Sequence, residues 1–148
     1  MASPVYSFKN LALAFTDPDV GQFSTSGQIG FGSATVSMAT ERTAMLVAAD
    51  GTVLISAMAG NNGHVMITCL QTSIIHTFLL SWYNAKIAKL NSGDISTWAA
   101  AKMSLRNTTT NTYHNCQGVA PSKIPDYPYE AQGKEVTWNI PCADIQNG

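Results

Sequence analysis

Much of the chain alternates large apolar residues with small or polar ones at the two-residue period of a β-strand. Leu11, Leu13 and Phe15 are separated by alanines, and Val36 and Met38 are separated by serine. This pattern is typical of strands that bury one face. Together with apolar runs bounded by turn residues, it predicts strands over residues 5–16, 34–39, 43–48, 52–57, 64–70, 103–109, 113–119 and 135–140.

Two short turns stand out in the middle of the chain. The dipeptide Asp50-Gly51 separates two apolar runs, which is a strong signal for a tight β-hairpin. A second turn, Asn61-Asn62-Gly63, precedes the next apolar run. The sequence therefore predicts an antiparallel meander of three strands between residues 43 and 70.

After residue 71 the apolar period changes to that of a helix, and we expect one α-helix over about Ser73 to Leu90. Thr72 or Ser73 can cap its N-terminus, and lysines in its last turn favour the helix dipole. The apolar residues form two stripes. The first contains Ile74, Ile75, Phe78, Leu79 and Trp82, and the second contains Leu80, Tyr83, Ile87 and Leu90.

A helix that is apolar nearly all round is buried on more than one side. One sheet covers only one stripe, so either the proline-rich loop over residues 121–133 or a neighbouring subunit must cover the other. We favour the neighbour. The expected subunit interface contains His76, Leu80, Tyr83 and Ile87, with His76 in the first helical turn at the surface or in the interface.

These elements amount to seven or eight strands and one helix. We expect a mainly β fold, an antiparallel β-sandwich or barrel with one flanking α-helix, in a single domain over residues 1–148. Residues 94–102 fit either a short helix or a loop that enters a strand. Charged residues make up only 11% of the chain and the formal net charge is −1. This composition argues against a disordered chain and a basic nucleic-acid binder. It leaves two interpretations open: a monomer with a surface rich in Ser and Thr, or a protein whose weakly charged surface is largely covered by copies of itself.

Candidate chemistry is sparse, and we predict no enzyme, no cofactor and no metal site. The three cysteines, Cys69, Cys116 and Cys142, form no CxxC pair. Asp17 and Asp19 begin like a calcium loop, but the glycine and glutamate that the loop requires are missing. We also expect no membrane anchor and no secretory signal, hence synthesis in a reducing cytoplasm.

The order and spacing of several segments resemble a known family. They are Tyr6-Ser7-Phe8-Lys9-Asn10, the run Arg42–Val53 around Asp50-Gly51, the run Gly63–Ser73 before the helix, and the closing run Gly133–Ile140. Together they resemble the tail tube proteins of contractile-tailed bacteriophages, a group long catalogued as phage structural proteins of unknown function. The resemblance spans nearly the whole chain.

The resemblance implies a virion protein of the phage tail, made in the cytoplasm of the host bacterium. Subunits of that family form hexameric rings in which strands from all six close an inner barrel. The rings stack into a tube through which DNA passes without specific binding. The implied partners are further copies of the chain, the tail sheath protein, and the tape-measure and baseplate proteins.

Two alternatives stay open. One is an inner-tube component of another contractile injection machine, which would also form rings. The other is a monomeric β-barrel module that binds a ligand, which would remain monomeric in dilute solution.

Overall fold

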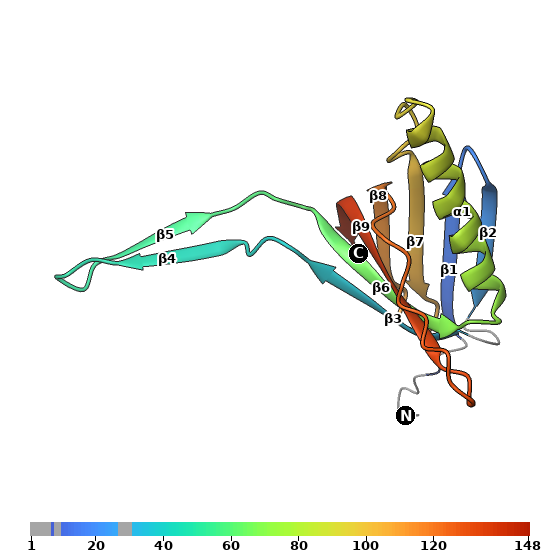
Figure 1. Ribbon diagram of the computed structural model, residues 1–148. Helices are drawn as coiled ribbons and strands as arrows, with labels where there is room; N and C mark the ends of the chain where they lie inside the picture. The colour runs from blue at the N-terminus through green and yellow to red at the C-terminus, as the bar shows by residue number, and fades with distance from the viewer. Residues whose placement is uncertain (1–6, 8–9, 27–30) are drawn as a thin grey trace.

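The computed structural model describes residue 7, residues 10–26 and residues 31–148. Nine strands and one helix lie in these ranges (Figure 1). They are β1 (Leu11–Asp17), β2 (Gly21–Ser26), β3 (Phe31–Met38), β4 (Thr43–Val47), β5 (Val53–Ala57), β6 (Gly63–Leu70), α1 (Ile74–Asn91), β7 (Ala101–Asn107), β8 (Thr112–Val119) and β9 (Glu135–Asn147). The prediction of a mainly β, antiparallel fold with one flanking helix is confirmed.

Seven strands form one antiparallel sheet in the order β2-β1-β7-β8-β9-β6-β3, which is curled into a half-barrel. The edge strands β2 and β3 are adjacent in sequence, with only residues 27–30 between them. In a flat sheet they would lie about 29 Å apart, whereas the chain between them reaches at most about 18 Å. A right-handed twist of roughly 20–25° per strand swings the end of β2 towards the start of β3. The curl is therefore a requirement of the topology.

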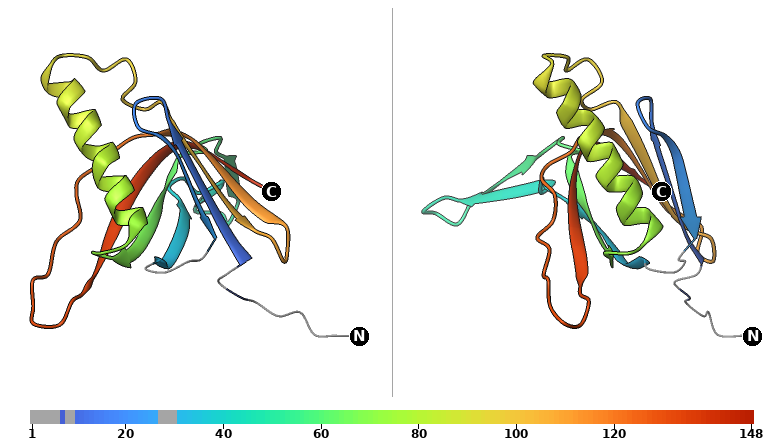
Figure 2. Two further views of the ribbon diagram at one scale, coloured as in Figure 1. Left: turned by 90° about the vertical axis from the view of Figure 1, so that its right-hand side faces the viewer. Right: turned by 45° about the vertical axis from the view of Figure 1, so that its right-hand side comes forward.

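Helix α1 packs against the inner side of this curl (Figure 2). Ser73 caps the helix, with its hydroxyl accepting a hydrogen bond from the backbone N–H of His76 at 3.3 Å. The first stripe supplies Trp82, which is fully buried and meets the ring of Phe15 edge-on at 5.1 Å. Phe15 also contacts Phe78 at 5.4 Å. The core thus combines most of the predicted first stripe with the inward-facing residues of the sheet, whereas Ile74 of that stripe is 76% exposed and lies outside the core.

The predicted three-strand meander is wrong in part. Strands β4 and β5 pair with each other as predicted, but β6 pairs with β3 and β9 and makes no ladder with β5. The turn before β6 lets the chain change direction instead of folding back. Strand β2 was not predicted, because Phe23 is its only large apolar residue. The first predicted strand begins at residue 11 in the described chain, and its residues 5, 6, 8 and 9 lie outside the described residues.

The proline-rich loop is confirmed as a long irregular segment, residues 120–134, which we call the strap. Gln71 fastens it through its side-chain amide, which donates to the carbonyls of Pro128 and Lys134 at 3.2 Å each. Tyr127 of the strap reaches the helix and places its hydroxyl 3.1 Å from Nε2 of His76. The strap therefore closes one side of the core near the start of α1.

Candidate assembly surface

A two-stranded arm projects away from the half-barrel (Figure 1). It consists of residues 43–57, that is β4, β5 and the turn between them. Hydrogen bonds between Arg42 and Met58 hold the two strands together at its base. The Arg42 carbonyl accepts from the Met58 N–H at 2.8 Å, and the Arg42 guanidinium donates to the Met58 carbonyl at 3.3 Å. Asp50 is the only charged residue between residues 43 and 60.

Both faces of the arm are apolar. Cross-strand partners share a face, so Leu46 and Leu54 lie on one face. The opposite face carries the pairs Met45–Ile55 and Val47–Val53. These six side chains are between 45 and 69% exposed, and none belongs to the core of the subunit. An exposed apolar hairpin of this kind is an aggregation hazard unless another molecule covers it.

The tip of the arm is a rigid turn. Gly51 has φ +91°, a conformation that favours glycine, and the Asp50 carboxylate accepts from the Thr52 N–H at 2.9 Å. That hydrogen bond lowers the pKa of Asp50 below its usual value. The sequence predicted this hairpin, but it did not indicate that the hairpin leaves the body of the subunit.

The sheet face opposite α1 is uncovered and mixed in character, because it exposes Met66, Leu70, Tyr113 and Glu135 beside many small or polar residues. It exposes small or uncharged side chains from several strands, together with the cations Lys102 and Arg106 on β7. Its other exposed residues include Ala14, Thr16, Asn115, Gln117, Thr137, Asn139 and Pro141. The two edge strands of the seven-stranded sheet are β2, which pairs with β1, and β3, which pairs with β6. The outer edge of each is not paired with any described strand of the subunit.

The four helix residues predicted for the interface lie in different environments. Leu80, Tyr83 and Ile87 are half-buried, and Tyr83 meets the indole of Trp138 edge-on at 6.4 Å. Their remaining exposed surface keeps the interface prediction open.

The expectation that His76 lies at the surface is wrong, because its side chain turns into the subunit and the residue is only 4% exposed. The indole N–H of Trp138 donates to its Nδ1 at 3.0 Å. Burial lowers the pKa of His76.

A cluster of charges joins the turn between β1 and β2 to the helix. The ammonium of Lys86 lies 2.9 Å from Asp17 and 2.8 Å from Asp19, and both Lys86 and Asp17 are buried. Lys89 binds the other oxygen of Asp19 at 2.7 Å. The hydrogen bonds from Lys86, Lys89 and Thr97 hold the pKa of Asp19 far below its usual range.

The same cluster holds the segment between α1 and β7. Thr97 donates its hydroxyl to Asp19 at 2.9 Å, and its carbonyl accepts from the Lys86 ammonium at 2.5 Å. Residues 94–100 contain a turn at 96–99 and no helix, so this segment is a loop that enters β7.

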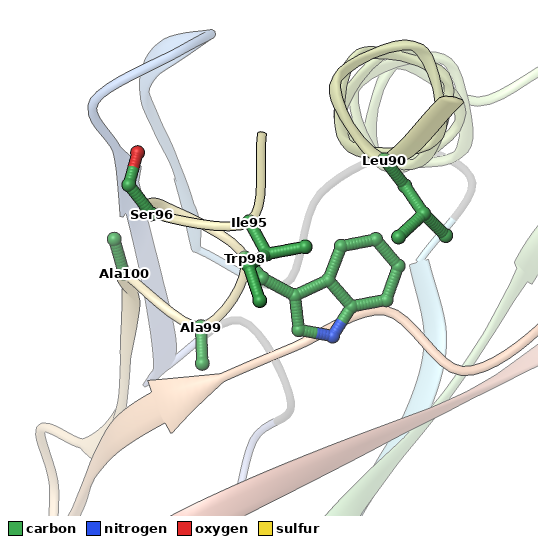
Figure 3. A pocket seen from close by; sticks show the side chains of 6 residues that line it. All are labelled: Leu90, Ile95, Ser96, Trp98, Ala99 and Ala100. Carbon is green, nitrogen blue, oxygen red and sulfur yellow. The ribbon is translucent and has the colours of Figure 1, made fainter. Parts of the chain in front are cut away.

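An apolar pocket of about 580 Å³ opens where this loop meets the end of the helix (Figure 3). We call it the helix-end pocket. Figure 3 shows the Trp98 indole facing Leu90 across it, with Ile95 beside the indole. Its lining residues are Leu90, Ile95, Ser96, Trp98, Ala99 and Ala100.

The described part of the chain contains no group of three or more His, Cys, Asp or Glu side chains placed to hold a metal ion. The described helix is not long and apolar enough to cross a membrane. The three cysteines are buried and free.

Solved structures with a similar fold come from contractile machines. The sheath/tube terminator of an extracellular contractile injection system, PVC, matches with a TM-score of 0.61 and 8% identity, covering 99% of this chain and 98% of that chain. A chain of the anti-feeding prophage baseplate matches with a TM-score of 0.64 and 12% identity, covering 99% and 97%. A chain of the PVC sheath–tube complex matches with a TM-score of 0.59 and 10% identity, covering 98% and 91%.

These identities are low, so the likeness establishes the fold alone. No curated protein matches the sequence. The model of the bacteriophage PhiTE tail tube protein family, in contrast, matches residues 1–148. Since that match spans the whole chain, the protein belongs to the bacteriophage PhiTE tail tube protein family and is a structural component of a tube.

Proposed function

We propose that this protein forms hexameric rings that stack into the inner tube of a contractile phage tail, through which DNA is delivered. The observation that carries the proposal is the arm. Its six large apolar side chains are exposed on two faces of a hairpin that projects from the body. A chain that functioned as a monomer would leave this surface in water.

The arm is large enough to drive association. Fully burying an aliphatic side chain contributes roughly 1.5–3 kcal/mol. Six half-exposed side chains therefore supply on the order of 5–10 kcal/mol per arm. Association costs about 4–15 kcal/mol in lost freedom of motion. One arm per subunit thus offsets much of this cost, and a ring adds lateral contacts.

The edge strands supply those lateral contacts. Strand β2 ends one margin of the half-barrel and β3 ends the other. If β2 of one copy lies beside β3 of the next, the contact is head-to-tail and every copy is used identically. Such contacts close into a ring when the rotation allows it, and closure removes exposed strand edges.

The uncovered face of the sheet suits the lumen. Lys102 and Arg106 are its cations on β7, and most of its other exposed side chains are small or uncharged. Affinity for DNA grows with each phosphate that a cation neutralises, so a face with few cations lets DNA slide.

The helix side would then face outward, towards the sheath. Tape-measure and baseplate proteins would contact the tube inside and at its end. Leu80, Tyr83 and Ile87 remain our proposed helix contribution to a subunit interface.

A second candidate is the inner tube of another contractile injection machine. The similarity of fold to chains from PVC and the anti-feeding prophage favours it. Both candidates require rings, and they differ in what the lumen carries. Isolation of the assembled particle and analysis of the lumen for DNA separates them.

The experiment that tests assembly compares both faces of the arm. Wild-type protein at high concentration should show rings or tubes by negative-stain electron microscopy. The double variant Leu46→Glu/Ile55→Glu should stay monomeric with unchanged circular dichroism, because burying two carboxylates without partners is costly. The control Leu46→Met/Ile55→Met should still assemble. A wild-type chain that remains monomeric at high concentration would overturn the proposal and favour the ligand-binding module.

A further inference from the structure

The helix-end pocket and the arm are two unpartnered apolar features of one chain. We infer that the pocket receives the Leu46–Leu54 face of the arm from another copy. This inference rests on the proposed assembly and names the surface that the arm contacts.

The Leu46–Leu54 face has the shape of a knob. The two leucines are directly opposite each other across the hairpin. The next pair on the same face, Ala44 and Ser56, is small. Leu46 is 69% exposed and Leu54 is 63% exposed. Two adjacent leucines between small neighbours can enter a cavity that a broad apolar surface cannot.

The helix-end pocket matches this knob in size and chemistry. Its volume of about 580 Å³ lies within the range of pockets that hold small molecules and leaves room for two leucine side chains. No lining residue is charged, and Leu90 and Ile95 at its rim are 43% and 65% exposed. Burying leucine against them removes apolar surface from water on both partners.

Other cavities in the described part of the chain suit an aliphatic knob less well. One is lined by Arg106 and a second by Lys102, both on the uncovered sheet face. A third includes Asp126 and Glu135. A leucine placed in any of them would remove a charged group from water without giving it a partner.

The walls of the helix-end pocket are held in place before any contact forms. One wall is the end of α1, and the other is the loop over residues 94–100. Thr97 in that loop binds Asp19 and Lys86, and Lys86 belongs to the helix. The charge cluster thus fixes the loop against the helix. A prearranged pocket costs less to occupy than one that must be ordered on binding.

The occupant must come from a different copy. The arm leaves the body beside β3 and β6 and points away, whereas the pocket lies at the far end of α1 (Figures 1 and 3). A projection and a pocket at different places on one chain make a head-to-tail contact. Each copy gives one arm and receives one, so the contact can extend along a ring or a stack. The Met45–Ile55 face remains free for a further copy.

Cysteine cross-linking tests the contact directly. The double variant Leu54→Cys/Ile95→Cys, assembled and treated with a thiol oxidant, should give a ladder of covalent oligomers on a non-reducing gel. The control Ile55→Cys/Ile95→Cys moves the arm cysteine to the opposite face and should give no ladder. The native cysteines are buried, which keeps the background low. If tubes form but the ladder is absent, or equals that of the control, the inferred contact is overturned while the proposed function stands.

Fluorescence of the unmodified protein gives a second measurement. Trp82 and Trp138 are 0% and 2% exposed in the subunit, whereas Trp98 lines the pocket and is half-buried. Assembly should therefore shift emission to shorter wavelength and remove the fraction of fluorescence that acrylamide quenches, because the arm covers Trp98. Tubes in which quenching is the same as in the free subunit would overturn the inference. Absence of tubes from the unmodified chain would instead overturn the proposed function.

Discussion

The body of the subunit and its arm are both built from antiparallel strands. The body buries most of its large apolar side chains inside the subunit, whereas the arm exposes its own to solvent. In the body most large apolar residues lie within the curl, and even its buried charges find partners inside the chain: Lys86 binds Asp17 and Asp19, and the Trp82 indole donates to Asp17 at 3.1 Å. In the arm neither face has a partner.

This difference separates folding from assembly. Residues that stabilise the body act on the free energy of unfolding of a single chain. Residues on the arm act on association and leave the isolated chain almost unaffected. An isolated hairpin is marginally stable in water, so covering the arm also orders it. Substitutions in the two regions should therefore change different measurements.

The largest effect on folding is expected from Lys86→Met. The substitution keeps an apolar stem but removes the ammonium from the buried Asp17 and from Asp19. Breaking one partner out of a buried ion pair costs about 3–5 kcal/mol. We expect a loss of this size in the free energy of unfolding, measured by urea denaturation of the monomer.

The matched variant in the arm is Leu54→Ala. It should change the free energy of unfolding of the monomer by less than about 0.5 kcal/mol, since it removes an exposed side chain. Similar losses for Lys86→Met and Leu54→Ala would contradict the distinction between body and arm.

Sequence patterns predicted the local elements well and their long-range partners poorly. The Asp50-Gly51 hairpin and the capped helix depend on neighbouring residues, and both were correct. The pairing of β6 with β9 joins segments about 70 residues apart, and no local period indicates it.

The charge cluster was missed for the same reason. In the sequence, Asp17 and Asp19 invited comparison only with a calcium loop, and Lys86 was one of the lysines expected to favour the helix dipole. Their contact spans nearly 70 residues of sequence.

The sequence of the arm carries a signal of its exposure on both faces. Two adjacent strands with apolar residues at consecutive positions, 45–47 and 53–55, cannot hide both faces against one sheet. A continuous apolar run in a hairpin indicates burial on two sides, whereas β9 alternates between exposed and buried residues over positions 135–142, as a strand with one buried face does. That contrast predicts that another molecule covers the arm, but it does not indicate which surface of that molecule the arm contacts.

A smaller effect on folding is expected for a substitution in the second helix stripe. Its residues Leu80, Tyr83 and Ile87 are half-buried, so they are less buried than the core of the body and less exposed than the arm. Ile87→Lys should leave the circular dichroism and melting of the monomer nearly unchanged, because Ile87 is only half-buried. In an assembly the ammonium would be buried without a partner, so tubes should fail to form. Ile87→Met is the control and should assemble. An Ile87→Lys monomer that unfolds would instead show that the body itself covers this stripe.

The smallest effect concerns pH and the body alone. The Trp138 indole can only donate, so Nδ1 of His76 must carry no proton, and the folded chain holds His76 neutral. Burial lowers its pKa in the folded state below the usual 6.5. The unfolded chain therefore takes up a proton first as the pH falls, and stability is lost from about pH 6.5 downwards until the lower folded pKa is reached. One proton gives a slope of at most about 1.4 kcal/mol per pH unit. Urea denaturation between pH 7.5 and 5 should show this slope in wild type and in the control His64→Gln. His76→Gln should lose it, whereas an unchanged slope would mean that other groups carry the pH dependence.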